Sequence, residues 1–187
     1  MELTDTEIIE RTLNGEPEAF NTLVRRWEHQ IYSLAFRMLG RDEEAYDICQ
    51  ETFLSAYRNL SKFRGDSKFS SWLYRIAINC CHNRIRSRGH SDISLDQQLE
   101  NQGFEPVTDA ENLTDGLQRE QIAELVRRAL AGLPPDMRQV IVMKEYQGLK
   151  FQEIADILNI PVSTVKTRLY TGLEQLKQRL SHLKTIL

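Results

Sequence analysis

Cysteine is scarce in this chain of 187 residues, and long apolar runs are missing. The three cysteines, Cys49, Cys80 and Cys81, are an odd number without C-x-x-C spacing, which predicts reduced thiols rather than disulfides. No run reaches the roughly 20 apolar residues that a membrane-spanning helix needs. The N-terminus is polar and acidic, unlike a signal peptide. These absences predict a cytoplasmic protein with no membrane insertion.

Enzyme motifs are missing as well. The chain has no glycine-rich phosphate loop, no H-x-E with paired cysteines and no carboxylates at metal-ligand spacing. Cys80, Cys81 and His82 are neighbours that would point about 100° apart on a helix, so they do not suit one metal ion. We therefore expect no enzyme, no catalytic residue, no metal and no cofactor.

Strand-like alternation is also absent, whereas helical periodicity is present through most of the chain. Thr4 and Glu7 fit a capping box for a first helix, and Pro17 suits the opening of a second, which Gly40 would close. A third helix would start at Asp42. Helical spacing returns after residue 68 and again after residue 121. The predicted fold class is all-α.

The pattern divides the chain into two small helical domains joined by a flexible linker. Residues 1–90 and 121–187 have helical spacing, and residues 91–120 are polar and acidic with scattered glycine and proline.

The distribution of charge follows the same division. Seven basic residues and one acid lie between Lys62 and Arg88, eight acids and one arginine between Ser91 and Glu120, and five basic residues and one acid after Pro161. This order suits two nucleic-acid contacts joined by an acidic segment, although a solvated charged face would explain each block singly.

The sharpest local pattern lies between Leu149 and Leu180. A short amphipathic helix would precede a turn at Asn159-Ile160-Pro161, and small Ala155 would let the next helix cross closely. The outer face of that next helix would carry Ser163, Thr164, Lys166, Thr167, Arg168, Tyr170 and Thr171. Short polar side chains followed by basic ones suit a recognition helix in the major groove. A helical hairpin with a solvated polar face is the alternative.

The basic segment after residue 62 mixes aromatic and cationic side chains, as in surfaces that stack on unpaired bases. Trp72 has the spacing of a core residue, and packing inside the domain is favoured for it. Phe63 lies in a loop outside any periodic face and is the better candidate for a base contact.

Several of these segments together resemble a known family. The motifs D-I-C-Q-E-T-F (47–53), F-R-G-D-S (63–67) and F-S-S-W-L-Y-R-I-A (69–77) resemble domain two of the extracytoplasmic-function (ECF) sigma factors, closest to the envelope-stress type. The segment P-V-S-T-V-K-T-R-L (161–169) and the helix before it resemble sigma domain four. The likeness follows the family's order and spacing in both domains, and only the linker lacks it.

The resemblance implies a transcription initiation factor that brings core RNA polymerase to −35/−10 promoters and opens the −10 element. The implied contacts with the β′ clamp helices of the polymerase are Asp47, Gln50, Glu51 and Leu54. The implied contacts with single-stranded −10 DNA are Phe63, Arg64, Gly65, Asp66, Ser67, Lys68, Asn79, Asn83 and Arg84. The seven outer-face residues of the recognition helix would read double-stranded −35 DNA. Thr171 stands where the family often has a basic residue, and Ser163 where it often has glycine.

Further partners are implied in the same way. Domain four would contact the β flap of the polymerase, and the acidic linker would follow its RNA-exit path. An anti-sigma factor would hold the protein inactive, near the membrane in some cases, and the active protein would be nucleoid-associated. The main alternative is a one-component regulator with a helical sensor domain before the helix-turn-helix. Such a regulator would bind DNA without the polymerase.

Overall fold

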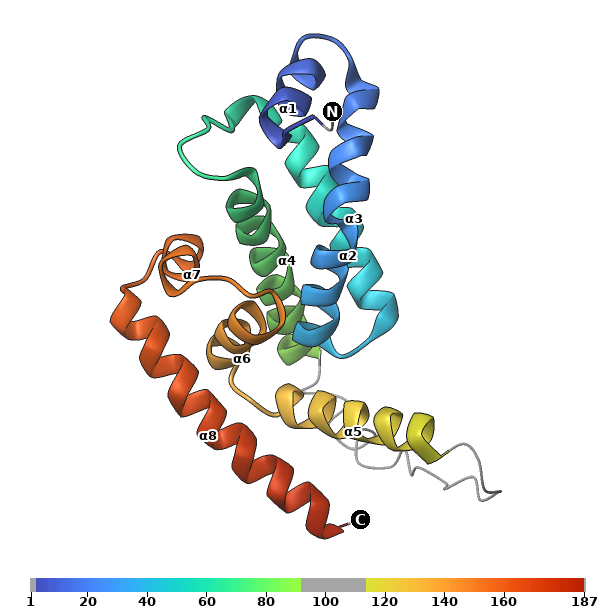
Figure 1. Ribbon diagram of the computed structural model, residues 1–187, viewed down its shortest axis with the longest axis vertical. Helices are drawn as coiled ribbons and strands as arrows, with labels where there is room; N and C mark the ends of the chain where they lie inside the picture. Colours follow the sequence, from blue (N-terminus) through green and yellow to red (C-terminus); the bar gives the residue numbers. More distant parts are fainter. Residues whose placement is uncertain (1–2, 92–113, 187) are drawn as a thin grey trace.

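The computed structural model describes residues 3–91 and 114–186, and all regular structure in these ranges is helical (Figure 1). The first domain comprises α1 (Asp5–Leu13), the short η1 (Pro17–Ala19), α2 (Phe20–Leu39), α3 (Asp42–Arg58), η2 (Leu60–Lys62) and α4 (Phe69–Ser91). The second comprises α5 (Thr114–Ala131), α6 (Pro135–Ile141), the π-helical η4 (Val142–Tyr146), α7 (Phe151–Leu158) and α8 (Val162–Ile186). The predicted all-α fold class is confirmed.

The predicted helix signals are present at the start of α1 and at the end of α2, whereas the predicted start of α2 at Pro17 is displaced. The Thr4 amide donates to Glu7 Oε2 at 2.6 Å and the Glu7 amide to Thr4 Oγ1 at 3.3 Å, which is the predicted capping box of α1. Gly40 ends α2 with a φ of 77°, a left-handed conformation that glycine adopts without steric cost. Pro17 opens a 3₁₀ turn, and α2 itself begins three residues later.

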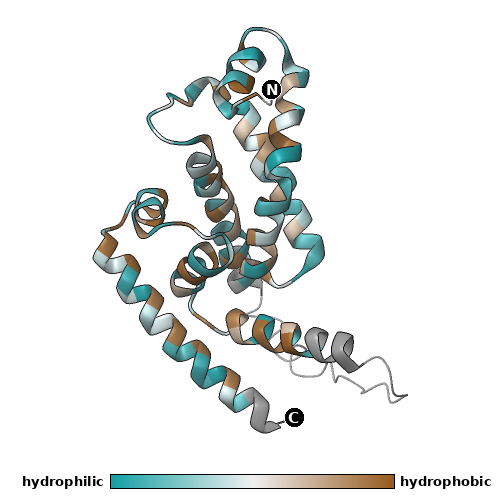
Figure 2. Ribbon diagram, viewed as in Figure 1, coloured by the Kyte–Doolittle hydropathy of each residue, from teal (hydrophilic) through white to brown (hydrophobic). Residues whose placement is uncertain are grey.

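The core of the first domain lies between α2, α3 and α4, which contact one another along much of their length. Leu23, Leu34, Ile48 and Leu73 are fully buried there, and Ile8 brings α1 onto the same cluster. The hydropathy pattern shows the cause, because apolar residues of each helix turn toward its neighbours and polar ones away (Figure 2). None of the described helices combines the length and apolar character needed to span a bilayer.

The second domain packs α6 and α7 against the first half of α8. Its buried side chains include Ile141, Met143, Ile154 and Val165. Gly172 lies where α8 crosses α6, so close that an added Cβ would lie 2.9 Å from Ile141 Cδ1. The small residue therefore permits the close crossing.

The boundaries of the predicted linker differ from the helices observed. The helix α4 runs to Ser91 and α5 begins at Thr114, so both extend into the segment 91–120. The polar, glycine-containing start of α5 carries a weak helical signal, which is why the pattern did not reveal it. The rest of the predicted linker, residues 92–113, lies outside the described residues.

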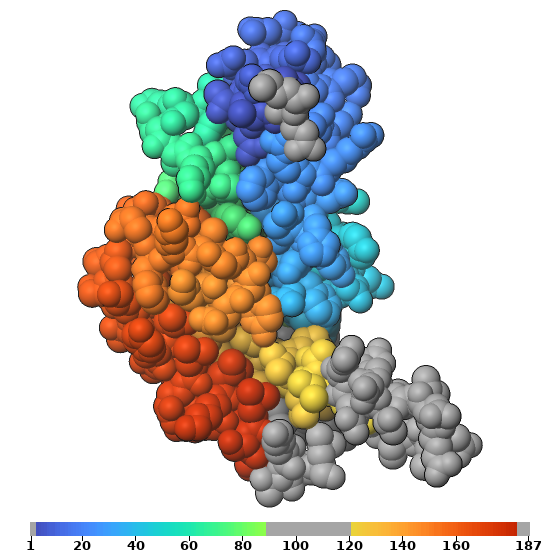
Figure 3. All heavy atoms as spheres, viewed as in Figure 1, coloured from blue at the N-terminus to red at the C-terminus, as the bar shows by residue number. Residues whose placement is uncertain are grey.

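The two domains lie directly against each other. One cluster of buried side chains runs through both of them, and α2 and α4 of the first domain contact α5, α6, η4 and α7 of the second. In the space-filling view the α6–α8 half meets the α2–α4 half without a break (Figure 3). The periodic pattern, which treats each helix alone, did not predict this contact.

Candidate nucleic-acid interface

The helices α7 and α8 form a helix-turn-helix. Asn159 ends α7 with a φ of 53°, a left-handed conformation that asparagine tolerates better than most residues. Ala155 is 4% exposed beneath the crossing, and Val165 and Leu169 of α8 are buried against α7. The predicted turn, the small residue at the crossing and the inward face of α8 are all present as the spacing indicated.

The predicted reading face of α8 lies on the outside of this unit. Ser163, Lys166, Thr167, Tyr170 and Thr171 are exposed, and Thr164 and Arg168 are partly buried. Arg168 Nη2 forms an ion pair with Asp136 Oδ2 at 2.8 Å. Five of the seven predicted side chains are therefore open to a ligand, while the Arg168 guanidinium already has an anionic partner within its own domain.

Lys144 of η4 and Lys166 of α8 both lie near the ring of Phe151, and the sequence pattern did not single out Lys144. Lys144 Nζ lies 4.9 Å and Lys166 Nζ 5.5 Å from the centre of the Phe151 ring. An aromatic face attracts cations, so Phe151 holds both ammonium groups near the start of α7. Lys144 could have been found from its charge, but no local pattern connects it with a helix that begins 18 residues later.

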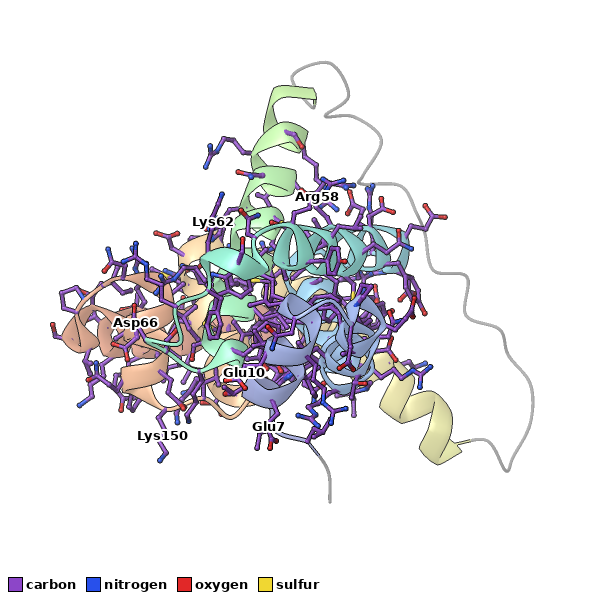
Figure 4. The ribbon with its side chains drawn as sticks, turned by 90° about the horizontal axis from the view of Figure 1, so that it is seen from above. Glu7, Glu10, Arg58, Lys62, Asp66 and Lys150 are labelled. Atoms are coloured by element: carbon purple, nitrogen blue, oxygen red, sulfur yellow. The ribbon has the colours of Figure 1, made fainter. Side chains whose placement is uncertain are left out.

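The loop 63–68 reaches out from the first domain toward the side on which α7 lies (Figure 1, Figure 4). Arg64, Gly65, Asp66, Ser67 and Lys68 are all exposed. Lys68 Nζ forms an ion pair with Glu153 Oε1 of α7 at 2.9 Å. Hydrogen bonding from Lys68, and from the Lys150 amide, lowers the pKa of the Glu153 carboxyl. The tip of the loop is free, and its last residue is attached to the second domain.

Phe63 is less free than its place in the loop suggested. Its ring centre lies 5.3 Å from that of Trp72 and 5.9 Å from that of Phe69, and the side chain is partly buried. The turn η2 buries Leu60 and directs Phe63 back onto the start of α4. Phe63 lies in the loop and Trp72 on α4, but both are partly buried and belong to one aromatic cluster packed against the core.

The remaining predicted contacts of the first domain lie on α4. Asn79 and Asn83 are exposed, one turn apart. Arg84 is partly buried and lies 3.6 Å from Asp47 of α3 in a loose ion pair. Asn79 also lines a cavity of about 230 Å³ between the domains, together with Arg168.

The predicted docking face on α3 is continuous and exposed. Asp47, Gln50, Glu51 and Leu54 all point to solvent, and Leu54 remains 55% exposed. They line a hollow of about 470 Å³. Next to it, a groove of about 930 Å³ between α2 and α3 carries apolar side chains, including Tyr46 and Tyr57. An acidic rim around exposed apolar groups suits a partner with basic and apolar side chains.

The three cysteines are free thiols, and the fold suppresses their ionisation. Burial raises the pKa of Cys49 and Cys80 to about 11 and that of Cys81 to about 12. For Cys80 the Glu51 carboxylate adds to the effect of burial. Within residues 3–88 and 121–182, no three His, Cys, Asp or Glu side chains gather into a group suited to a metal ion.

Slow thiol alkylation is the expected consequence. A thiol pKa of about 11 in place of 9.0 lowers the thiolate fraction at pH 8 by ~100-fold. We expect iodoacetamide to modify the folded chain at pH 8 at least 100-fold more slowly than the chain in denaturant, with Cys81 slowest. Mass spectrometry of timed samples measures this. Labelling of any of the three at the denatured rate would contradict it.

Comparison with known proteins agrees with the two-domain geometry. Residues 23–91 match the family model Sigma-70 region 2, and residues 123–176 match Sigma-70, region 4. The chain is similar to RNA polymerase sigma-H factor of Pseudomonas aeruginosa, with 35% identity over 183 residues, 96% of this chain and 95% of that protein. It is 36% identical over 189 residues to ECF RNA polymerase sigma-E factor of Salmonella typhimurium, and equally to that of Escherichia coli K12, covering 97% of each chain.

Solved structures share the fold. CnrH, solved in complex with the cytosolic domain of CnrY, superposes with a TM-score of 0.67 at 24% identity, covering 95% of this chain and 97% of that one. The sigma factor RpoE of Bartonella quintana, solved with the anti-sigma factor NepR, gives 0.65 at 21% identity, covering 87% and 96%. Both family models match in order along the chain, and relatives above 30% identity cover nearly all of it. Together with the helix-turn-helix and the exposed acidic face of α3, these matches show that the chain belongs to the ECF group of the sigma-70 family of RNA polymerase sigma factors.

Proposed function

We propose that this chain binds core RNA polymerase through α3 and directs it to promoters that have separate −35 and −10 elements. The observation that carries the proposal is the division of its exposed polar surfaces. An acidic face with exposed leucine lies on α3, and a hydroxyl-rich, basic face lies on α8 of the helix-turn-helix. The first repels the phosphate backbone and the second attracts it, so the two faces require different partners.

The α3 face suits the polymerase. Asp47 and Glu51 would pair with basic side chains of the β′ clamp helices, and Leu54 would enter an apolar contact. The neighbouring groove between α2 and α3 extends the apolar area beyond these residues. Exposed apolar side chains of this size are the usual anchors of protein interfaces.

The α8 face suits the major groove at the −35 element. Ser163, Thr167 and Lys166 project from the first turns, where a recognition helix reaches the base edges. Lys144 would add a phosphate contact beside them. Tyr170 is 62% exposed and has a polar tip for DNA at the far end of the face. The β flap would contact the same domain away from the DNA.

The loop 63–68 and the outer side of α4 suit single-stranded −10 DNA. Arg64 and Lys68 offer positive charge, and the part-exposed Phe63–Trp72 cluster offers a ring surface for an unpaired base. Asn79 and Asn83 carry amides that can hydrogen-bond a base edge. Extruding a base costs a few kcal/mol of stacking, which such contacts would offset.

An anti-sigma factor is the further partner that we propose. The Bartonella relative in the solved complex is bound by one, and the apolar groove between α2 and α3 offers a surface for such a protein. The proposed location is the cytoplasm, on the nucleoid when active and near the membrane when the anti-sigma factor is anchored there.

The test is run-off transcription with purified core polymerase on fragmented genomic DNA. We expect discrete transcripts only when both the chain and core polymerase are present. A chain that binds DNA tightly alone and ignores core polymerase would be a one-component regulator. Failure to associate with core polymerase would overturn the proposal.

Substitution of Lys166 by alanine tests the division between the domains. Loss of one base contact costs ~1–3 kcal/mol, so we expect ~5- to 150-fold weaker promoter binding by the holoenzyme. The affinity of the chain for core polymerase should stay unchanged. Filter binding at several salt concentrations and a polymerase titration measure the two quantities. Gln178→Ala, also exposed on α8 but beyond the proposed reading face, is the control. A fall in polymerase affinity for Lys166→Ala would contradict the assignment.

A further inference from the structure

Arg168 lies on the flank of the proposed reading face of α8 rather than at its centre. Residues four apart share one side of a helix, so Arg168 is in line with Thr164 and Gly172. Thr164 and Arg168 are partly buried on this side, and Gly172 is buried. Thr167, one residue before Arg168, points about 100° away and is exposed. The Arg168 side chain therefore faces the neighbouring helix more than it faces the solvent.

That neighbour is α6, which lies alongside α8 (Figure 1). At the crossing, a Cβ added to Gly172 would lie 3.2 Å from Met137 Cβ. Asp136 precedes Met137 in the first turn of α6, and Arg168 precedes Gly172 by one turn. The close crossing therefore brings Asp136 to Arg168, and Arg168 Nη2 lies 2.8 Å from Asp136 Oδ2.

This ion pair lies wholly within the second domain, so it does not depend on where the first domain lies. The Arg168 side chain is 28% exposed and that of Asp136 is 56% exposed. An ion pair that water reaches in this way contributes little to the stability of a fold. Its effect is therefore expected in what the guanidinium can bind, not in the stability of the domain.

The flank position also decides which part of DNA the Arg168 guanidinium could reach. A recognition helix reads base edges with its central face, and the two phosphate strands run along the sides of the groove. A guanidinium on the flank would bind phosphate, which adds affinity for any sequence and steepens the dependence on salt. The Asp136 carboxylate competes with phosphate for this guanidinium, and its own charge repels phosphate.

We propose that Asp136 limits the affinity of the recognition helix for DNA, because it pairs with Arg168 and withholds this guanidinium from the phosphates. The inference rests on the proposed function, since it concerns the same helix. Asp136 acts through Arg168, so it is a positioning residue and not a DNA contact. Differences in affinity between related complexes lie mostly in the dissociation rate. The pair would therefore let the domain leave the −35 element faster than a helix with an unrestrained Arg168.

The first test is Asp136→Asn, which removes the negative charge and keeps the size of the side chain. Filter binding by the holoenzyme compares a promoter found by run-off transcription with the same duplex carrying a scrambled −35 element. We expect at least ~3-fold tighter binding to both duplexes at low salt, and a log–log salt slope that is steeper by ~1. Asp136→Glu keeps the carboxylate and should bind DNA as the wild type does. A misfolded helix-turn-helix would lose affinity, so misfolding cannot imitate the gain.

A double-mutant cycle identifies the group that gains the DNA contact. Arg168→Met should weaken DNA binding at least ~3-fold more in the Asp136→Asn background than in the wild-type background, because only there is the guanidinium released. An equal loss in both backgrounds overturns the proposal. A gain for Asp136→Asn that is confined to the intact −35 element also overturns it, since Arg168 would then read a base.

The matched control is Asp156→Asn, which removes the same charge from the same domain. Asp156 is exposed on α7, and its carboxylate accepts a hydrogen bond from Gln152 within that helix. This variant should bind DNA within about twofold of the wild type. A gain equal to that of Asp136→Asn would reflect net charge alone and would overturn the proposal.

A measurement without polymerase separates this inference from the proposed function. The free full-length chain is titrated with a random-sequence duplex at low salt. Asp136→Asn should bind at least ~3-fold tighter than the wild type, and Asp136→Asn/Arg168→Met should lose that gain. Equal binding by Asp136→Asn and the wild type overturns the inference. Failure of the wild-type chain to associate with core polymerase overturns only the proposed function.

Discussion

Charge reversal of Asp47 and Glu51 to lysine is expected to weaken the binding of this sigma factor to core RNA polymerase at least 100-fold. Both side chains are exposed on α3 and line the same hollow as Leu54. In an interface with basic residues, each reversal replaces an attraction by a repulsion, and truncation of one such charge alone costs ~2–5 kcal/mol. Titration of labelled chain with core polymerase at low salt measures the change.

A matched variant separates the position from the charge. Glu10→Lys/Glu16→Lys makes the same change in net charge at two exposed acids outside α3, and should bind core polymerase within about twofold of the wild type. Both variants should keep the wild-type melting temperature within a few degrees, because surface substitutions change stability little. Equal binding by the two variants would remove α3 from the docking surface.

Leu73→Ala is expected to have the largest effect on stability. Leu73 of α4 is fully buried in the core cluster, and a leucine-to-alanine change in such a place costs ~2–5 kcal/mol in the free energy of unfolding. For a chain of this size that lowers the melting temperature by ~4–20 °C. Because buried residues of both domains form one cluster, we expect a single unfolding transition in calorimetry.

The control for this prediction is Leu13→Ala. Leu13 is 50% exposed at the end of α1, so the same chemical change should cost less than about 1 kcal/mol. Similar losses for the two variants would mean that Leu73 does not occupy a tightly packed core. Two separate transitions in the wild type would mean that the two halves of the cluster do not unfold together.

Much of the candidate site followed from local pattern. The exposed reading face of α8, the turn at Asn159 and the acidic face of α3 lie on elements whose apolar spacing already showed which side is buried. A helix repeats every 3.6 residues, so a run of ten or more residues determines its own inner and outer faces. The capping box of Thr4 and the terminating Gly40 are similarly local.

Other features depend on residues far apart in the chain. Arginine is usually exposed, yet Arg138 is buried where α6 packs against α2, and it donates to the Met38 carbonyl, 100 residues earlier in the chain. Phe63 lies in a loop but packs on Trp72. The π-helical turn of η4 and the start of α5 at Thr114 also escaped the pattern. The apolar spacing within a single helix does not reveal any of these features.

The amino-acid order by itself determined the helices, their buried stripes and the family resemblance, because backbone hydrogen bonds and side-chain spacing act over a few residues. The tertiary structure alone decided that the two domains meet, that guanidinium groups cap the ends of α2 and α7, and that Asn79 and Arg168 share a cavity. These outcomes arise from the complementarity of surfaces and charges on separate helices, which no local pattern contains.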